Sequence, residues 1–482
     1  MKAQAANKTL LFETMPIPKA VANLAVPTIL SSLVMVLYNL ADTYFVGMLN
    51  DPLQNAAVTL AAPVLLAFNA VNNLFGVGTS SMMSRALGRR EYDMVRRSSA
   101  MGFYCALFCG ALFAMLCTLG KGPLLVLLGA DEATTPATAA YMLWTVSCGA
   151  VPAILNVVLA YLVRSEGASF HASIGTMSGC LLNIVLDPIF IMPWGLGMGA
   201  AGAGLATFLS NCAACAYFFI LLYVKRKSTY VCVNPRMLGW NKAIILGICG
   251  VGIPASIQNL LNVTGMTILN NFTSEYGADA VAAMGISQKI SMVPLQIALG
   301  FSQGIMPLIS YNYASGNHPR MKKAITFAMK IMMPGLFAVM ALFWIFSAGL
   351  TGAFMENESI IAYGTEFLRG FSITMPFLGM DFLAVGVFQA LGKGKYALVF
   401  ALLRKIVLEI PALFVLNWLF PLYGLPYAQP FAEMVLAAAA VFMLWRIFRQ
   451  CNLQQSQKRH SCAKRGCRIK RRMTYGTIGI SL

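Results

Sequence analysis

The sequence contains few charged residues, and few acidic ones in particular. Only 11% of its 482 residues are charged, 58% are hydrophobic, and 17 are Asp or Glu, whereas a soluble domain carries about 25% charged residues. A soluble chain of this length would need polar surface over roughly two or three hydrophobic cores, and this sequence cannot provide it. The composition therefore excludes an ordinary soluble protein and favours one whose exterior faces lipid.

Motifs of nucleotide hydrolysis and metal chemistry are also missing. The chain has no Gly-x-x-x-x-Gly-Lys-Ser/Thr phosphate loop and no His-Glu-x-x-His pair, and it contains only three His. One Gly-x-Ser-x-Gly match, Gly300–Gly304, lies inside an apolar run rather than between a strand and a helix, so it does not indicate a hydrolase. Cys212 and Cys215 have the spacing of a metal or redox pair, but no second pair accompanies them. We expect no enzyme, no cofactor and no metal site.

Long uncharged runs are what the sequence does contain. A membrane helix needs roughly 20 mostly apolar residues, and such runs must be helical in lipid because every backbone polar group needs an internal partner. The predicted spans are residues 20–48, 56–83, 98–119, 136–163, 171–193, 199–224, 243–272, 280–310, 324–350, 363–391, 397–420 and 425–446. The sequence therefore predicts an all-α integral membrane protein with twelve transmembrane helices in a lipid bilayer.

The net charge of +18 is distributed over particular loops rather than over one face that could bind nucleic acid. The basic excess lies in the 2–3, 6–7, 8–9 and 10–11 loops, whereas the 1–2, 3–4, 7–8 and 9–10 loops are acidic. The positive-inside rule places the basic loops in the cytoplasm, and an even number of spans places both termini there too. We expect a multi-pass protein of the inner (plasma) membrane with no nucleic-acid partner.

The two halves of the chain resemble each other. Residues 84–88 after helix 2 have a counterpart at 310–316, and residues 162–167 have one at 388–393, both offset by about 225 residues. Six helices return the chain to the same side, so these repeats should be parallel lobes around a central cleft, related by an axis along the membrane normal. The predicted domains are a cytoplasmic N-terminus (1–19), an N-lobe (20–224), a cytoplasmic linker (225–242), a C-lobe (243–447) and a polybasic cytoplasmic tail (448–482).

Two acids inside the predicted spans of the first half have polar neighbours on the same helix face. Asp42 follows Tyr38 by four residues, and Asp187 follows Asn183 by four. A carboxylate within the membrane is costly enough to be a functional candidate by default. We expect this group to bind a proton or a small cation. The alternative is that the carboxylates only tie helices 1 and 5 to their neighbours.

Pro27 lies fifteen residues before Asp42 on helix 1. It removes a backbone hydrogen bond and permits a kink. Pro27 is therefore a hinge candidate if protonation changes the partners of Asp42, and a static kink is the alternative.

The second half contains further acids. Asp381 on helix 10 is a candidate, and Lys289 on helix 8 is a cation within a span that could balance it. No partner for Glu433 is evident in the sequence.

Two other acids have basic neighbours on the same helix. Glu366 precedes Arg369 by three residues, which predicts an exposed ion pair. Glu409 follows Arg404 and Lys405, which favours an ion pair near the cytoplasmic end over a functional carboxylate.

Several segments together resemble the multidrug and toxic compound extrusion (MATE) family, from about residue 12 to 447. They are residues 37–47 in helix 1, 84–89 after helix 2, 182–188 in helix 5, 197–203 and 388–395. Their order and spacing carry the resemblance. It implies two six-helix lobes around a central cleft and export of small organic cations against a proton or sodium gradient by alternating access.

The resemblance also implies roles for individual residues of the first lobe. The family's ion site involves a helix 1 Asp and a helix 5 Asn and Asp, which match Asp42, Asn183 and Asp187. Tyr38 lies nearby, and Thr207 on helix 6 is expected to line the same pocket.

A second-lobe site in some members uses a helix 7 Glu and a helix 10 Asp. Asp381 matches the Asp, but the helix 7 position is Asn262 or Gln258, and neither is an acid. This departure favours proton coupling in the first lobe, as in bacterial DinF-like members, over a sodium site in the second.

These observations predict a monomeric antiporter that exports organic cations or drugs, coupled to protons rather than sodium. In the expected cycle, the outward-facing state takes up a proton at Asp42 and Asp187 and releases its bound cation. The neutralised carboxylates then allow the return inward. The alternative is a flippase of lipid-linked precursors from the same superfamily, which usually has extra helices and a more cationic cavity.

Overall fold

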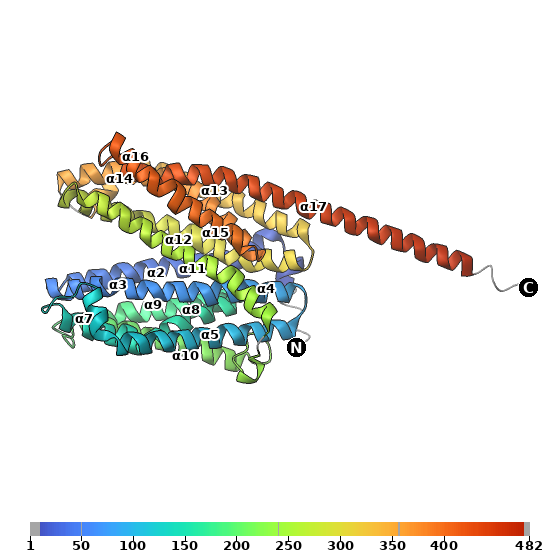
Figure 1. The fold of residues 1–482 in the computed structure, drawn as a ribbon, viewed down its shortest axis with the longest axis horizontal. Coiled ribbons are helices and arrows are strands. Elements are labelled where there is room, and N and C mark those ends of the chain that lie inside the picture. The colour runs from blue at the N-terminus through green and yellow to red at the C-terminus, as the bar shows by residue number, and fades with distance from the viewer. Residues whose placement is uncertain (1–9, 50, 240, 355–356, 477–482) are drawn as a thin grey trace, which may run out of the picture.

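A computed structural model describes residues 10–49, 51–239, 241–354 and 357–476, with side chains up to Leu453. The described residues form helices and connecting turns without any β-strand (Figure 1). Ten helices in this range are long and apolar enough to cross a membrane, and an eleventh span results if the pair Thr135–Cys148 and Ala150–Ser165, bent by 48°, is taken as one. The predicted all-α membrane architecture is confirmed.

The first half begins with a short turn and continues through six spans. Its elements are η1 (Leu10–Thr14), α2 (Ile17–Gly47), α3 (Pro52–Asn72), η2 (Asn73–Val77), α4 (Gly78–Gly88), α5 (Tyr92–Leu119), α6 (Lys121–Leu127), α7 (Thr135–Met142), η3 (Leu143–Cys148), α8 (Ala150–Ser165), α9 (Ser169–Ile191) and α10 (Ala200–Val224). The second span consists of α3, η2 and α4 together.

The second half follows the short helix η4 (Pro235–Met237). Its elements are α11 (Lys242–Ser274), α12 (Ala278–Ala314), α13 (His318–Gly352), α14 (Glu358–Ala390), α15 (Gly394–Leu402), η5 (Leu403–Glu409), α16 (Ile410–Leu419), η6 (Leu425–Tyr427) and α17 (Ala428–Gly476). The run α15–η5–α16 corresponds to the predicted span 397–420. It is less apolar than the other spans because Arg404, Lys405 and Glu409 lie in its middle.

Short polar residues start several of these helices. The side chain of Asp51 accepts from the backbone N–H of Leu53 at 2.9 Å, and Asn241 accepts from that of Ala243 at 2.9 Å. Such caps satisfy backbone donors that the first helical turn leaves free. They explain why α3 and α11 begin where the hydrophobic runs meet polar loops.

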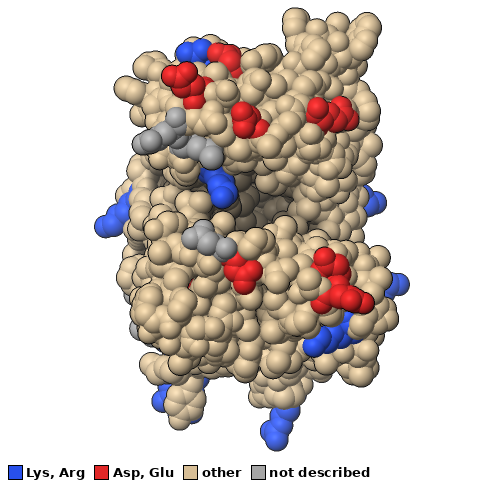
Figure 2. All heavy atoms as spheres, turned by 90° about the vertical axis from the view of Figure 1, so that its left-hand side faces the viewer, with Lys and Arg blue, Asp and Glu red and all other residues tan. Residues whose placement is uncertain are grey.

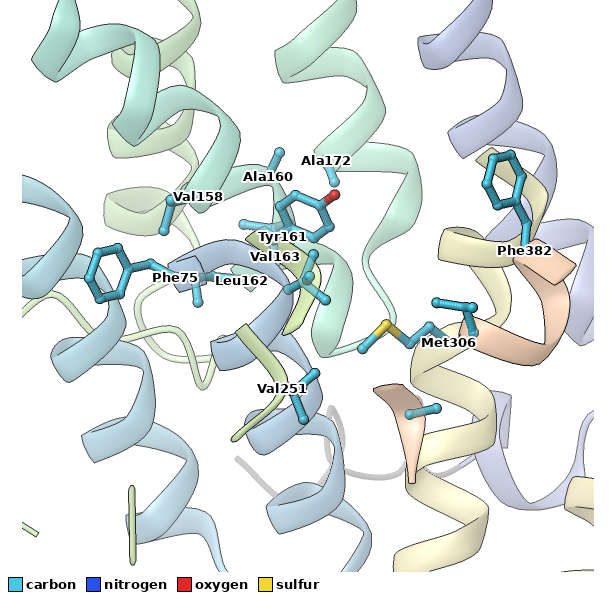
Figure 3. Close-up of a cluster of buried hydrophobic side chains, with 14 of the residues drawn as sticks. Phe75, Val158, Ala160, Tyr161, Leu162, Val163, Ala172, Val251, Met306 and Phe382 are labelled. Carbon is cyan, nitrogen blue, oxygen red and sulfur yellow. The ribbon is translucent and has the colours of Figure 1, made fainter. Parts of the chain in front are cut away.

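The helices form two groups that lie side by side in Figure 1, α2–α10 in one and α11–α17 in the other. Within the first group α2 packs along α9, within the second α12 packs along α14, and α2 and α12 meet between the groups. Buried apolar side chains continue from one group into the other, as Phe75 on η2, Val251 on α11 and Phe382 on α14 show (Figure 3).

The two ends of the molecule differ. Figure 2 shows the end at which α2 meets α3, where acidic side chains surround a hollow between the two groups of helices. We call this the acidic end, because it carries the acidic loops of the sequence. The end that carries the α4–α5, α12–α13 and α14–α15 connections is called the basic end.

Small residues allow the two groups to touch toward the basic end. A Cβ atom at Gly252 on α11 would lie 2.0 Å from the carbonyl oxygen of Leu74, and one at Gly304 on α12 would lie 2.7 Å from the Cα atom of Ala25. Glycine permits such backbone approach where any side chain would separate the helices. The groups are therefore in close contact toward the end opposite the hollow.

Candidate functional site

Asp187 and Asn183 on α9 are almost completely buried, with exposures of 0% and 1%. With its amide oriented to satisfy its neighbours, Asn183 donates to Oδ2 of Asp187 at 2.8 Å. Its oxygen accepts from the backbone N and the Oγ1 of Thr207 on α10, at 3.1 and 3.3 Å. The spacing of four residues on one helix thus makes the amide a bridge between the carboxylate and α10.

Asp42 and Tyr38 on α2 complete this cluster. Asp42 lies close enough to Asp187 for the two carboxylates to interact electrostatically. The hydroxyl of Tyr38 is near both carboxylates and interacts with Thr207. The structure therefore brings together all five residues that the sequence analysis assigned to the first-lobe site.

Tyr141 on α7 belongs to the same cluster, although no pattern in the sequence points to it. It is buried, with an exposure of 4%, and interacts with Asp42, Tyr38 and Asp187. A tyrosine in an apolar run carries no signal of its own in the sequence. Its proximity to helices 1 and 5 depends on the packing of three separate spans.

Asp42 and Asp187 interact electrostatically with each other rather than with a basic side chain. Within the described part of the chain, neither Asp42 nor Asp187 forms an ion pair, and Oδ1 of Asp42 is buried without a hydrogen-bond partner. Two like charges in a buried site are costly unless they are neutralised. The arrangement is therefore suited to hold a proton or a small cation between α2 and α9.

In the second half, a buried arginine lies among polar side chains from several helices. Nη1 of Arg404 on η5 lies 3.0 Å from Oδ2 of Asp381 on α14 and 3.6 Å from Oε1 of Glu433 on α17. Its Nη2 donates to Oδ1 of Asn262 on α11 at 2.6 Å. The side chains of Arg404, Asp381 and Glu433 are at most 2% exposed. Four separate elements thus meet at one guanidinium group.

One expectation for this half needs correction, and two open assignments are resolved. Lys289, which we expected to balance Asp381, is exposed on α12, and Arg404 takes that place. Glu433, for which the sequence showed no partner, also pairs with Arg404. Of the two alternatives for the helix 7 position, Asn262 is the one that contacts this network.

The two expected ion pairs within helices are present. Lys405 Nζ lies 2.5 Å from Oε1 of Glu409, and Arg369 Nη1 lies 2.8 Å from Oε1 of Glu366. The Glu366 pair is partly exposed, as predicted. The Lys405–Glu409 pair, in contrast, is buried, and Glu409 also interacts with Glu433.

Pro27 lies within α2, which continues as one helix from Ile17 to Gly47. It lines an open groove together with Met15, Asn23 and His171. Its role as a hinge stays a prediction. Ser302 of the Gly-x-Ser-x-Gly match lies inside α12 and donates to the carbonyl of Phe382 at 2.7 Å, so it is not placed on a strand-to-helix turn.

Comparison with known proteins gives consistent results. The MatE family model matches residues 27–189 and 254–415, one stretch in each half. The multidrug export protein MepA of Staphylococcus aureus (strain MRSA252) is 33% identical over 449 residues, covering 92% of this chain and 97% of that protein. MepA of Staphylococcus saprophyticus is 33% identical over 437 residues, covering 90% and 95%.

Solved structures show the same architecture. An outward-facing multidrug resistance MATE family transporter of the MOP superfamily aligns with a TM-score of 0.86 and 26% identity, covering 92% of this chain and 98% of that one. A MOP superfamily transporter from Pyrococcus furiosus, described as having a binding pocket of reverse polarity, aligns with a TM-score of 0.85 and 26% identity over 92% and 98%.

Proposed function

Since the chain belongs to the MatE family and is a multidrug efflux transporter of the membrane, we propose that it exchanges protons for small organic cations by alternating access. The relatives named MepA are multidrug export proteins, which favours drugs over lipid-linked precursors as substrates. The proposed coupling site consists of Asp42 and Asp187, with Tyr38, Asn183 and Thr207 positioning them.

The single observation that carries this proposal is the pair of interacting carboxylates, Asp42 and Asp187, which form no ion pair among the described residues. A site that needs a mobile cation for neutrality changes its charge when that cation leaves. A helix interface with a charge in it is less stable than one without, so the occupancy of the site can bias which conformation the protein adopts. This is the property that an antiporter requires.

The proposed cycle starts with the hollow between the lobes open at the acidic end (Figure 2). A proton from that side binds at Asp42 and Asp187 and releases the exported cation. The neutral site then favours closure at the acidic end and opening at the basic end, where the proton leaves and a new substrate binds. Substrate and proton thus compete for the same negative charge.

The orientation in the membrane follows from the charge of the loops. We place the basic end and both termini in the cytoplasm of a bacterial cell, and we propose that the transporter acts as a monomer. The two lobes provide the whole pathway in a single chain. Asp381, Asn262 and Lys289 are proposed to shape the second-lobe wall of the pathway, and Pro27 to be the hinge of helix 1.

The test uses inverted membrane vesicles that are acidic inside and a fluorescent organic cation such as ethidium. We expect uptake in the wild type that a protonophore abolishes and that sodium does not replace. Asp42→Asn should abolish uptake, while Glu366→Gln, which neutralises a partly exposed acid outside the site, should leave it unchanged. Uptake that depends on a sodium gradient would change the coupling ion, and unaltered uptake in Asp42→Asn would remove the proposed site.

A further inference from the structure

The fifth span of each half carries the same short pattern around an acid. Ile184-Val185-Leu186-Asp187 on α9 is matched by Ile406-Val407-Leu408-Glu409 on η5. Four residues before the acid, the first half has Asn183 and the second has Lys405. One position earlier, Leu182 is matched by Arg404. The second half therefore carries two cations at positions where the first half is neutral.

Arg404 is a buried counter-ion of the acids around it and does not belong to an exposed surface. Its guanidinium group lies against Asp381 at 3.0 Å, Glu433 at 3.6 Å and the amide oxygen of Asn262 at 2.6 Å. The planar fork of donors suits several oxygen acceptors at once. Oδ1 of Asp381 and Oε2 of Glu433 are buried without a hydrogen-bond partner among the described residues, so the oxygens around Arg404 are not saturated.

We infer that Arg404 is a tethered counter-cation that fills the carboxylate site of the second lobe and excludes mobile cations, Na⁺ above all, from it. The first-lobe site is then the single place where an ion from solution can couple to transport, a consequence that rests on the proposed function. Carboxylate and amide oxygens are the ligands that hard cations prefer. Here three such groups, from α11, α14 and α17, converge on a side chain that cannot leave.

Replacing the guanidinium by a neutral group should convert this place into a cation site. In Arg404→Gln, the carboxylates of Asp381 and Glu433 and one amide oxygen would remain in a buried space beside the Lys405–Glu409 ion pair. Buried carboxylates without a partner strongly favour any cation that can reach them. Arg404→Lys keeps a charge at the same position and is the matched control.

The experiment measures thermal unfolding of the purified protein in Na⁺ or choline at equal ionic strength. All variants carry Asp42→Asn, so that a sodium response of the first-lobe site does not contribute. We expect no sodium response in this background or with Arg404→Lys. Arg404→Gln should show a rise in Tm that saturates with Na⁺, and adding Asp381→Asn should abolish that rise.

Two results would overturn the inference. One is a rise in Tm with Na⁺ in the Asp42→Asn variant that is lost when Asp381→Asn is added. The native second lobe would then bind Na⁺. This comparison does not require Arg404→Gln to fold. The other is a folded Arg404→Gln variant without any sodium response. Neither result bears on whether Asp42 couples export to protons, which the vesicle assay decides separately.

A second observation, independent of the charge network, concerns the segment η1 and Met15 at the basic end. The ring of Phe12 is fully buried, stacks on Tyr311 of α12 with ring centroids 4.7 Å apart, and lies against Gly167 of the α8–α9 turn. Arg320 of α13 donates to the carbonyls of Phe12 and Met15, at 2.6 and 2.5 Å. The segment therefore contacts both lobes.

Glu13 adds a polar bridge between the same two lobes. Its Oε1 accepts from the Tyr311 hydroxyl at 2.7 Å and from Nη2 of Arg90, in the α4–α5 loop, at 3.4 Å. We propose that residues 10–15 act as a latch that keeps the lobes together at the basic end and must release before this end can open. The latch is thus a part of the alternating-access cycle proposed above.

Hydrogen exchange tests the latch without any transport assay. In the variant Phe12→Ala/Glu13→Gln, amides at the basic ends of α4 and α12 should exchange faster, while those of α7 at the acidic end should not change. Thr14→Ala, which removes only a hydrogen bond within the turn at 3.2 Å, is the control. Unchanged exchange in α4 and α12 of the double variant would refute the latch.

Discussion

The two lobes solve the same electrostatic problem in different ways. In the first lobe Asp42 and Asp187 interact electrostatically and form no ion pair among the described residues, and Asp187 accepts from the neutral amide of Asn183. In the second lobe three acids share two built-in cations, Arg404 and Lys405. A buried charge must be paired in either case. In the proposed mechanism the first site takes its partner from solution and can therefore respond to a gradient, whereas most of the charge in the second is balanced by the chain itself.

The largest difference expected between the two lobes concerns transport. Asp187→Asn should lower proton-coupled export by an order of magnitude or more, because the charge that attracts both proton and substrate is halved. It should not lower the thermal stability, since a neutral amide relieves repulsion from Asp42. Proton release on substrate addition to proteoliposomes and Tm in detergent measure the two effects. Asp131→Asn, at an exposed loop, is the control, and retained coupling in Asp187→Asn would contradict the comparison.

The second lobe should show the reverse pattern, with stability as the main effect. Arg404→Met leaves two buried carboxylates without their cation, and removing one partner of a buried pair costs about 3–5 kcal/mol. Lys289→Met, at an exposed position, should change the free energy of unfolding by no more than about 0.5 kcal/mol. Denaturant unfolding in micelles measures both.

A compensating substitution sharpens this expectation. Adding Glu433→Gln to Arg404→Met should restore part of the lost stability, because one of the unpaired carboxylates is then neutral. If Arg404→Met were as stable as the Lys289 variant, the guanidinium group would not be the counter-ion that its contacts indicate.

Helix periodicity was enough to predict two polar pairs of the candidate first-lobe site, whereas Thr207 was expected there from the resemblance to the family. Tyr38 and Asp42 share one face of α2, and Asn183 and Asp187 share one face of α9, because residues four apart lie on the same side of a helix. The burial of carboxylates in apolar runs then singled them out. Positions within one helix are predictable because the backbone fixes their geometry.

Contacts between spans could not be found in this way. Asp381 and Arg404 are 23 residues apart on different helices, and the sequence suggested Lys289 as the partner because it was the cation at greater apparent depth. Arg404 was assigned to a helix end with Lys405 because both are charged. Tyr141 and Phe12 carried no signal, since their importance arises from packing that brings distant segments together.

A smaller difference is expected between the side-chain amides of the two lobes, Asn183 and Asn262. Asn183→Ala leaves Asp187 without the amide donor and the Thr207 hydroxyl without one of its partners, which should cost about 1–3 kcal/mol. Asn262→Ala should cost less, because Arg404 retains its two carboxylate partners. Export should fall several-fold in the first variant and little in the second. Equal losses of export in both would mean that the two lobes contribute alike to coupling.

The smallest expected effect belongs to the ion pair at the acidic end of α14. Glu366 and Arg369 are 2.8 Å apart, but their side chains are 43% and 36% exposed, so water and salt screen their attraction. Glu366→Gln should therefore change the free energy of unfolding by less than about 1 kcal/mol, and less still at high salt. Denaturant unfolding at low and high salt measures this change. A loss of stability as large as that of Arg404→Met would mean that charge pairs stabilise this protein regardless of burial. The contrast between the lobes would then reflect the position of each pair in the bundle rather than the need to neutralise a buried charge.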